Sequence, residues 1–171
     1  IWCHTCRRHS AKQAREGSKL TPMCGIVGYV GQGDTTAVLT SGLKRLEYRG
    51  YDSAGIAVLE SDEIAVRKRS GKLARLVELL ETSPVDAGGT GIGHTRWATH
   101  GGPTDVNAHP HLGDNGKLAL IHNGIVENFA ELRAELDAAG IELKSETDTE
   151  VVAALLGLEV SRVGDLEQAF R

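Results

Sequence analysis

Residues 23–32 read MCGIVGYVGQ. Within this stretch, Ile26–Val30 is rich in β-branched and aromatic residues and is bounded by turn-forming glycine. The pattern predicts a buried strand that ends at Gly31. Met23 is the only methionine in the chain, and the small, reactive residue Cys24 follows it directly. We therefore expect the natural start of the folded protein at Met23, with a cysteine at the beginning of the first strand.

Downstream of this strand, short apolar runs alternate with helical patterns. Strands are expected at apolar or alternating runs, namely Gly55–Leu59, Glu63–Lys68, Thr90–Thr95, Leu118–His122 and Ile141–Lys144. Helices are expected at apolar residues of helical spacing or after capping residues, namely after Asp34 or Thr35, over Lys72–Leu80, over Glu127–Ala139, after Thr147 and after Asp165. Hairpins mixed with helices predict an α+β domain with mainly antiparallel sheet.

Two local patterns predict how helices begin and which side they bury. The face of the first helix carries the apolar residues Val38, Leu39, Leu43 and Leu46. Thr147 with Glu150 three residues later has the spacing of a capping box, in which each residue satisfies a free N–H at the start of a helix.

Composition excludes several classes of protein. The chain has 171 residues, of which 40% are apolar and 25% charged, as in soluble globular domains. It contains no run of 18 apolar residues, which excludes a transmembrane helix. A net charge of -4 argues against binding to nucleic acid or to an anionic membrane. Its three cysteines do not form a disulfide scaffold, so a reducing, cytoplasmic location is expected.

The first 22 residues differ in charge from the rest of the chain. They hold five basic residues and one acidic residue, whereas the remainder has a net charge of -8. We interpret residues 1–22 as an extension that is unstructured, translated from upstream, or a leader such as a transit peptide. Cys3 and Cys6 with His4 and His9 allow a zinc site, but no second ligand pair follows after a longer spacer.

Several segments carry chemistry that local structure does not require. They are MCGIVG at 23–28, EYRGYDSAG at 47–55, GHTRWATHG at 93–101, HNG at 122–124 and SETDTE at 145–150. Together they resemble the class II glutamine amidotransferases, which are N-terminal nucleophile hydrolases, over residues 24–171. The resemblance implies a four-layer αββα sandwich of antiparallel sheets, here truncated at the C-terminus. The runs YRGYDSAG and HTRWATHG are similar to those of the members that make a hexosamine phosphate.

Cys24 is the candidate nucleophile. A free cysteine thiol has a pKa of about 8.5, so it needs a base near neutral pH. If Cys24 is the first residue of the mature protein, its own α-amine, with a pKa of about 7.7–8.0, can take the proton. Without the neighbouring motifs, a small buried cysteine at a strand start would be the simpler interpretation.

Asn123 and Gly124 follow a predicted strand and are similar to the family's oxyanion hole. A side-chain amide and a backbone N–H can both donate to an oxygen that becomes negative in the transition state. The alternative is that Asn-Gly simply forms a turn between Ile121 and Ile125.

Oppositely charged residues suit the two ends of an amino acid. Arg96 can bind the α-carboxylate of glutamine bidentately, and Asp148 can accept its α-ammonium group. The alternatives are a surface ion pair for Arg96 and a favourable charge at a helix start for Asp148. By the resemblance, other residues contribute to the glutamine site: Thr99 and His100 line the pocket, Trp97 closes over it, and Arg49 lies close to Cys24.

The histidines allow a metal interpretation that we do not favour. His94 and His100 with His109-Pro110-His111 form a possible ligand set, but no acidic or cysteine residue accompanies them at a tight spacing. The resemblance implies no metal, and no cofactor is expected.

The resemblance also implies partners and missing parts. In the complete enzyme, glutamine and fructose 6-phosphate give glutamate and glucosamine 6-phosphate, and fructose 6-phosphate binds two sugar isomerase domains that this sequence lacks. The full-length enzyme is expected to be a homo-oligomer. Three alternatives remain open: an inactive glutamine-binding fragment, another class II enzyme such as an amidophosphoribosyltransferase, and a zinc-dependent interaction module built on the N-terminal cysteines.

Overall fold

The structure, a computed structural model, describes residues 24–85 and 88–171. The N-terminal extension and its proposed zinc ligands lie outside the described residues. The helices and strands follow in the order β1 Gly25–Val30, α1 Thr35–Leu46, β2 Ser53–Glu60, β3 Glu63–Ser70, α2 Leu73–Thr82, β4 Thr90–Arg96, β5 His111–Gly113, β6 Leu118–Leu120, α3 Phe129–Ala138, α4 Asp148–Val163 and α5 Leu166–Ala169. Single 3-10 turns occupy Glu47–Arg49 and Asp114–Gly116.

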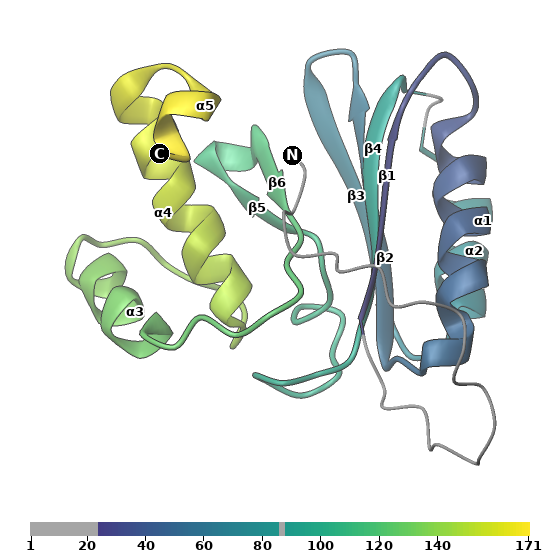
Figure 1. The fold of residues 1–171 in the computed structure, drawn as a ribbon, viewed down its shortest axis with the longest axis horizontal. Helices are drawn as coiled ribbons and strands as arrows, with labels where there is room; N and C mark the ends of the chain where they lie inside the picture. The colour runs from purple at the N-terminus through teal and green to yellow at the C-terminus, as the bar shows by residue number, and fades with distance from the viewer. Residues whose placement is uncertain (1–23, 86–87) are drawn as a thin grey trace, which may run out of the picture.

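Two antiparallel sheets form the middle of the molecule. The larger has the strand order β1-β4-β2-β3, and the smaller pairs β5 with β6. Figure 1 shows α1 and α2 against the outer face of the larger sheet, whereas α4 and α3 lie beyond the smaller sheet. The layers therefore run helix, sheet, sheet, helix, which is the αββα arrangement expected for this α+β chain.

The main apolar core lies between the larger sheet and its two helices. Fully buried side chains from β2 and both helices meet there, namely Leu39, Leu43, Ile56, Val58 and Leu76. On β4, Gly91 faces α1 so closely that a Cβ atom would lie 2.7 Å from Thr35 and 3.0 Å from Leu39. The glycine lets the helix pack directly on the strand.

The structure confirms most elements that the sequence predicts and corrects others. The strand expected over Ile141–Lys144 is wrong, because this segment has no regular structure, and the strand expected over Leu118–His122 ends at Leu120. The three-residue strand β5 had no periodic signal, because three residues are too few to show one. Val38, predicted to be buried, is 40% exposed on the outer side of α1.

Side-chain caps fix where the helices start. Asp34 accepts a hydrogen bond from the backbone N–H of Ala37 at 2.9 Å, and Thr147 accepts one from the N–H of Glu150 at 3.3 Å. The Glu150 carboxylate does not complete the predicted capping box at Thr147. It accepts instead from the N–H groups of Ser145 and Lys144, the latter at 3.0 Å. The cap thus also holds the chain that enters α4.

We expect Leu43→Ala to lower the free energy of unfolding by about 2–5 kcal/mol, because it leaves a cavity in the core against β4. Val38→Ala, on the exposed side of the same helix, is the matched control and should change it by less than about 1 kcal/mol. Urea unfolding of both variants measures the difference. Equal losses would contradict the assignment of the buried face of α1.

Candidate active site

A cavity of about 270 Å³ opens where the N-terminal end of β1 meets the C-terminal end of β4. Antiparallel pairing of Gly25 with Thr95 brings the residue before β1 beside the last residues of β4. Segments from both layers complete the wall, so that the cavity is lined by Cys24, Arg96, Trp97, Thr99, His109, His122, Asn123, Gly124, Ile125 and Thr149.

Cys24 presents its sulfur to this cavity. The side chain is half-buried, and the backbone N–H of Trp97 donates to Sγ at 3.2 Å. The strand pairing fixes this contact, because Trp97 follows directly after β4. The thiol in turn donates to the carbonyl oxygen of Trp97 at 3.7 Å, so both backbone groups of this residue contact Cys24.

Asn123 is held in one orientation by a buried histidine. Its Oδ1 lies 2.6 Å from Nε2 of His94, and its Nδ2 donates to the carbonyl oxygen of Cys24 at 3.4 Å. Burial lowers the pKa of His94 to about 4, so the ring is neutral near pH 7. Because an amide oxygen only accepts, the hydrogen of this neutral ring lies on Nε2. The amide NH₂ group of Asn123 is thereby directed toward the cysteine.

Arg96 lines the cavity from the end of β4 and is 3% exposed. Its guanidinium donates to the carbonyl oxygens of His100, Gly101 and Gly102, the last two at 3.3 and 3.4 Å. Burial lowers its pKa, whereas the charges of Asp52, Cys24 and Asp148 act in the opposite direction. A buried cation therefore lies at the wall and shapes the loop that follows β4.

Asp148 does not line the cavity itself. Its carboxylate accepts a hydrogen bond from the N–H of Val126 at 2.9 Å, which ties the segment after β6 to the first turn of α4. Its neighbour Thr149 reaches the cavity.

Of the other predicted site residues, Trp97 and Thr99 line the cavity, and Trp97 is 45% exposed. His100 and Arg49 are not part of the lining. The His100 ring packs on Phe129 at 4.6 Å between ring centroids, and Arg49 lies in the 3-10 turn after α1.

Sequence reasoning assigned no role in glutamine binding to four residues of the lining: His109, His122, Ile125 and Thr149. Three of them adjoin residues that were predicted, so closeness along the chain could have identified them. The sequence indicated His109 only as a possible metal ligand; the structure brings it to the cavity from the segment before β5. Its ring lies 4.5 Å from that of His94 and 4.9 Å from that of His111, centroid to centroid.

This row of three histidines is uncharged near neutral pH. Burial lowers the pKa of His94 to about 4 and that of His111 to about 3, and it lowers the pKa of His109 as well. In the part of the chain that the structure describes, no group of three or more metal-ligating side chains has a geometry that could hold an ion.

Comparisons with known proteins match this chain to a family. Residues 81–163 match the family model described as a glutamine amidotransferase domain. The glutamine–fructose-6-phosphate aminotransferase [isomerizing] of Leifsonia xyli subsp. xyli is 65% identical over 150 residues, and that of a strain of Thermus thermophilus is 60% identical over 149. Each alignment covers 87% of this chain and 24% of the relative.

The fold is also found in two solved enzymes. A structure described as the allosteric regulatory enzyme of purine biosynthesis aligns with a TM-score of 0.70 and 32% identity. The glutamine phosphoribosylpyrophosphate amidotransferase of B. subtilis aligns with a TM-score of 0.68 and 30% identity. Each alignment covers 84% of this chain and 31% of the solved chain.

The chain belongs to the glutamine amidotransferases. Its fold is that of the class II, N-terminal nucleophile type, as the sequence resemblance implies. The chain spans about a quarter of the length of the aminotransferases that it matches. None of the helices described for this amidotransferase domain is long and apolar enough to cross a bilayer.

We expect the free energy of unfolding to fall as the pH is lowered from 6.5 toward 5. The folded pKa of His94 is depressed, so in this window the unfolded chain binds protons that the folded chain does not. Each such histidine contributes a slope of about 1.4 kcal/mol per pH unit. Carboxyl groups of the unfolded chain titrate lower, near pH 4.

Urea unfolding at several pH values, on the wild type and on His94→Phe, measures this slope. Phenylalanine keeps a ring of similar size but has no proton to bind, so the variant should show the smaller slope. An identical slope in both proteins would show that His94 is already protonated in the folded state at pH 6.

Proposed function

We propose that this chain is the glutaminase part of a glutamine–fructose-6-phosphate aminotransferase, in which Cys24 attacks the side-chain amide of glutamine and releases ammonia. The observation that carries the proposal is the sequence similarity, which is about twice as high to these aminotransferases as to the purine enzymes. Those enzymes share the fold, so identity in sequence rather than fold separates the two activities.

The chemistry begins at the thiol of Cys24. When this residue is first in the chain, its α-amine accepts the thiol proton, and the thiolate attacks the amide carbonyl. The tetrahedral intermediate collapses, ammonia leaves with a proton from the α-ammonium, and a thioester remains. Water then hydrolyses the thioester to glutamate and restores the thiol. The N–H of Trp97, 3.2 Å from the sulfur, holds the nucleophile at the cavity.

Stabilisation of the negatively charged oxygen in that intermediate is assigned to Asn123 and Gly124. The Asn123 amide is directed toward Cys24, and Gly124 also lines the cavity, where its N–H can donate. His94 holds the amide in this orientation through its 2.6 Å contact to Oδ1. Donors that are fixed before the reaction lower the barrier because they need not reorganise as the charge develops.

Binding of the α-carboxylate and the α-ammonium group of glutamine is assigned to Arg96 and Asp148. Arg96 contributes a cation at the cavity wall, and its charge and that of Asp148 act on each other. We assign supporting roles in glutamine binding to Trp97, Thr99, His100 and Arg49. Of these, the first two line the cavity, whereas His100 and Arg49 would act from beside it.

Further parts of the proposal concern the whole protein. L-glutamine is the substrate of this domain, which needs no cofactor or metal. Fructose 6-phosphate binds only to sugar isomerase domains that lie outside this sequence, and the full-length enzyme is a cytoplasmic homo-oligomer. The alternatives are an inactive glutamine-binding fragment and another class II activity.

The decisive experiment uses the full-length protein in two forms, one that begins at Cys24 and one that keeps residues 1–23 uncleavably. The first form should release glutamate from glutamine and, with fructose 6-phosphate present, produce glucosamine 6-phosphate. The second form should be slower by about 10²–10⁴-fold, because an amide nitrogen cannot serve as the base. Cys24→Ala in the trimmed form is the inactive control.

Three results would each contradict part of the proposal. Absence of glutamate release from the trimmed form would favour the inactive fragment. Glutamate release without hexosamine phosphate would favour another class II activity. Equal rates of both forms, with intact termini verified by mass, would overturn the role of the α-amine.

A double-variant comparison tests whether His94 acts through Asn123. We expect Asn123→Ala to lower kcat by about 10²–10³-fold, the usual loss for an oxyanion donor. His94→Phe should lower kcat less, by about tenfold, with the KM for glutamine little changed. Because the two residues form one unit, the double variant should be no slower than Asn123→Ala alone. Multiplied losses would show that His94 contributes independently of Asn123.

A further inference from the structure

The buried segment 107–110 lies against the larger sheet without joining it. It has no regular structure, yet all four residues are buried, so its backbone oxygens need partners inside the protein. Among the described residues, the strand beside it, β3, pairs only with β2. Lys68 on β3 supplies the partners. Its Nζ donates to the carbonyl oxygens of Val106 at 3.1 Å, Ala108 at 2.7 Å and Pro110 at 3.1 Å.

The three acceptor carbonyls belong to every second residue along the chain, and a single ammonium group donates a hydrogen bond to each of them. Burial lowers the pKa of Lys68 to about 8, while the nearby carboxylates of Glu150 and Asp105 act against this shift. An ammonium group with three carbonyl acceptors uses all of its donors. Lys68 therefore supplies this segment with hydrogen-bond donors that the backbone of a neighbouring strand would otherwise supply.

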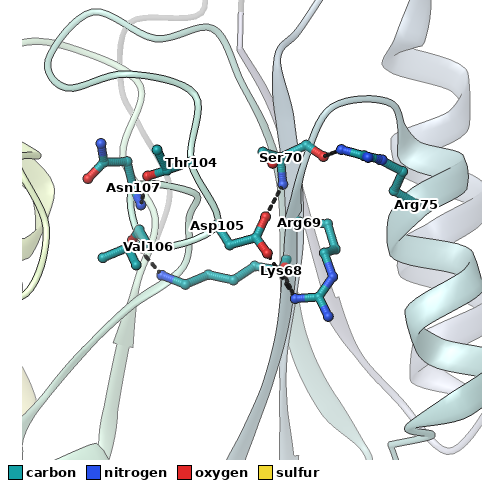
Figure 2. A network of polar contacts seen from close by, with 8 residues as sticks. All are labelled: Lys68, Arg69, Ser70, Arg75, Thr104, Asp105, Val106 and Asn107. Carbon is teal, nitrogen blue, oxygen red and sulfur yellow. Dashed lines mark hydrogen bonds and ion pairs between the residues drawn. The ribbon is translucent and has the colours of Figure 1, made fainter.

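A second contact from β3 fixes where the segment begins. The Asp105 carboxylate accepts from the backbone N–H of Ser70 at 2.7 Å and pairs with Arg69 at 3.0 Å. Figure 2 shows Asp105 between these two groups, with Lys68 reaching past them to Val106. Two successive residues of β3, Lys68 and Arg69, thus hold the same loop at adjacent points.

The segment carries His109 into the active-site cavity. The His109 ring lines that cavity and lies 4.5 Å from the ring of His94, which in turn holds Asn123. On its other side, the His109 carbonyl lies so close to β2 that a Cβ atom on Gly55 would be 2.2 Å from it. Movement of the segment toward the sheet is blocked, and Lys68 prevents movement away from it.

We propose that Lys68 is a positioning residue for glutamine hydrolysis. Its ammonium group holds the segment 107–110, and Val106 before it, so that the ring of His109 keeps His94, and through it Asn123, in place beside Cys24. The inference rests on the proposed glutaminase function. It assigns to a side chain outside the cavity an effect on kcat, transmitted through one backbone segment and the two neighbouring rings of His109 and His94. Cys24 itself lies next to β1 and β4, so its intrinsic reactivity should not depend on Lys68.

The test uses full-length protein that begins at Cys24. Lys68→Met removes the charge and the donors while it keeps an unbranched side chain, and Lys68→Arg keeps both charge and donors. Arg75→Met is the matched control, because Arg75 of α2 also donates to a carbonyl at the end of β3, that of Ser70 at 3.3 Å, but does not contact segment 107–110 or line the cavity.

Two rates are measured on each variant. The first is glutamine hydrolysis, resolved into kcat and KM. The second is alkylation of the Cys24 peptide by N-ethylmaleimide, which needs a reactive thiol but no oxyanion hole. We expect Lys68→Met to lower kcat by about tenfold or more, as loss of hydrogen bonds to a charged group would. Its KM, its alkylation rate and the activity of Arg75→Met should stay within about twofold of wild type, and Lys68→Arg should recover most of kcat.

Three results would overturn the inference: a kcat of Lys68→Met within twofold of Arg75→Met, a parallel loss of alkylation, or a Lys68→Arg variant no faster than Lys68→Met. If Lys68→Met does not yield folded protein by circular dichroism, Lys68→Gln replaces it under the same criteria. Wild-type protein without glutaminase activity would instead contradict the proposed function, which keeps the two failures distinct.

Discussion

The antiparallel pairing of β1 with β4 is the constraint on which the site depends. It sets Gly25 opposite Thr95, so Cys24 lies beside the backbone of Trp97 at the point where β4 ends. A shift of one residue in this register would turn Arg96 away from the cavity and toward α1, because side chains alternate across a strand. Gly91 and Gly93 of β4 favour this register, because α1 packs directly on them. A shift of one residue would place a larger side chain where the helix leaves little space for a Cβ atom.

Polar contacts hold the loop after β4 and the strand β5 against the start of α4. Asn107 exchanges hydrogen bonds with the backbone and side chain of Glu146, and His111 meets Thr147 at 2.9 Å. These contacts connect the loop beside β3 to the start of α4, where Asp148 holds the segment that carries Asn123. A connected set of directional hydrogen bonds of this kind fixes the relative positions of the segments that it joins.

The three buried histidines beside the cavity carry no charge near neutral pH. The charged side chains that act on one another beside them are Arg96, Asp52 and Asp148. A neutral His94 can still orient Asn123, because its Nε2–H donates to Oδ1 of the amide. Burial therefore keeps these histidines uncharged, and His94 orients its neighbour through a hydrogen bond.

The sequence by itself determined the α+β class, the first strand and its cysteine, and most helix starts, because periodicity and capping are local properties. It also indicated Cys24, Arg96, Asn123 and Gly124, which the fold brings to one cavity. Only the tertiary structure decided that His109 lies there, that Ile141–Lys144 is not a strand, and that Lys68 holds a distant loop. These features depend on partners far along the chain, and no local pattern encodes which buried carbonyl meets which side chain.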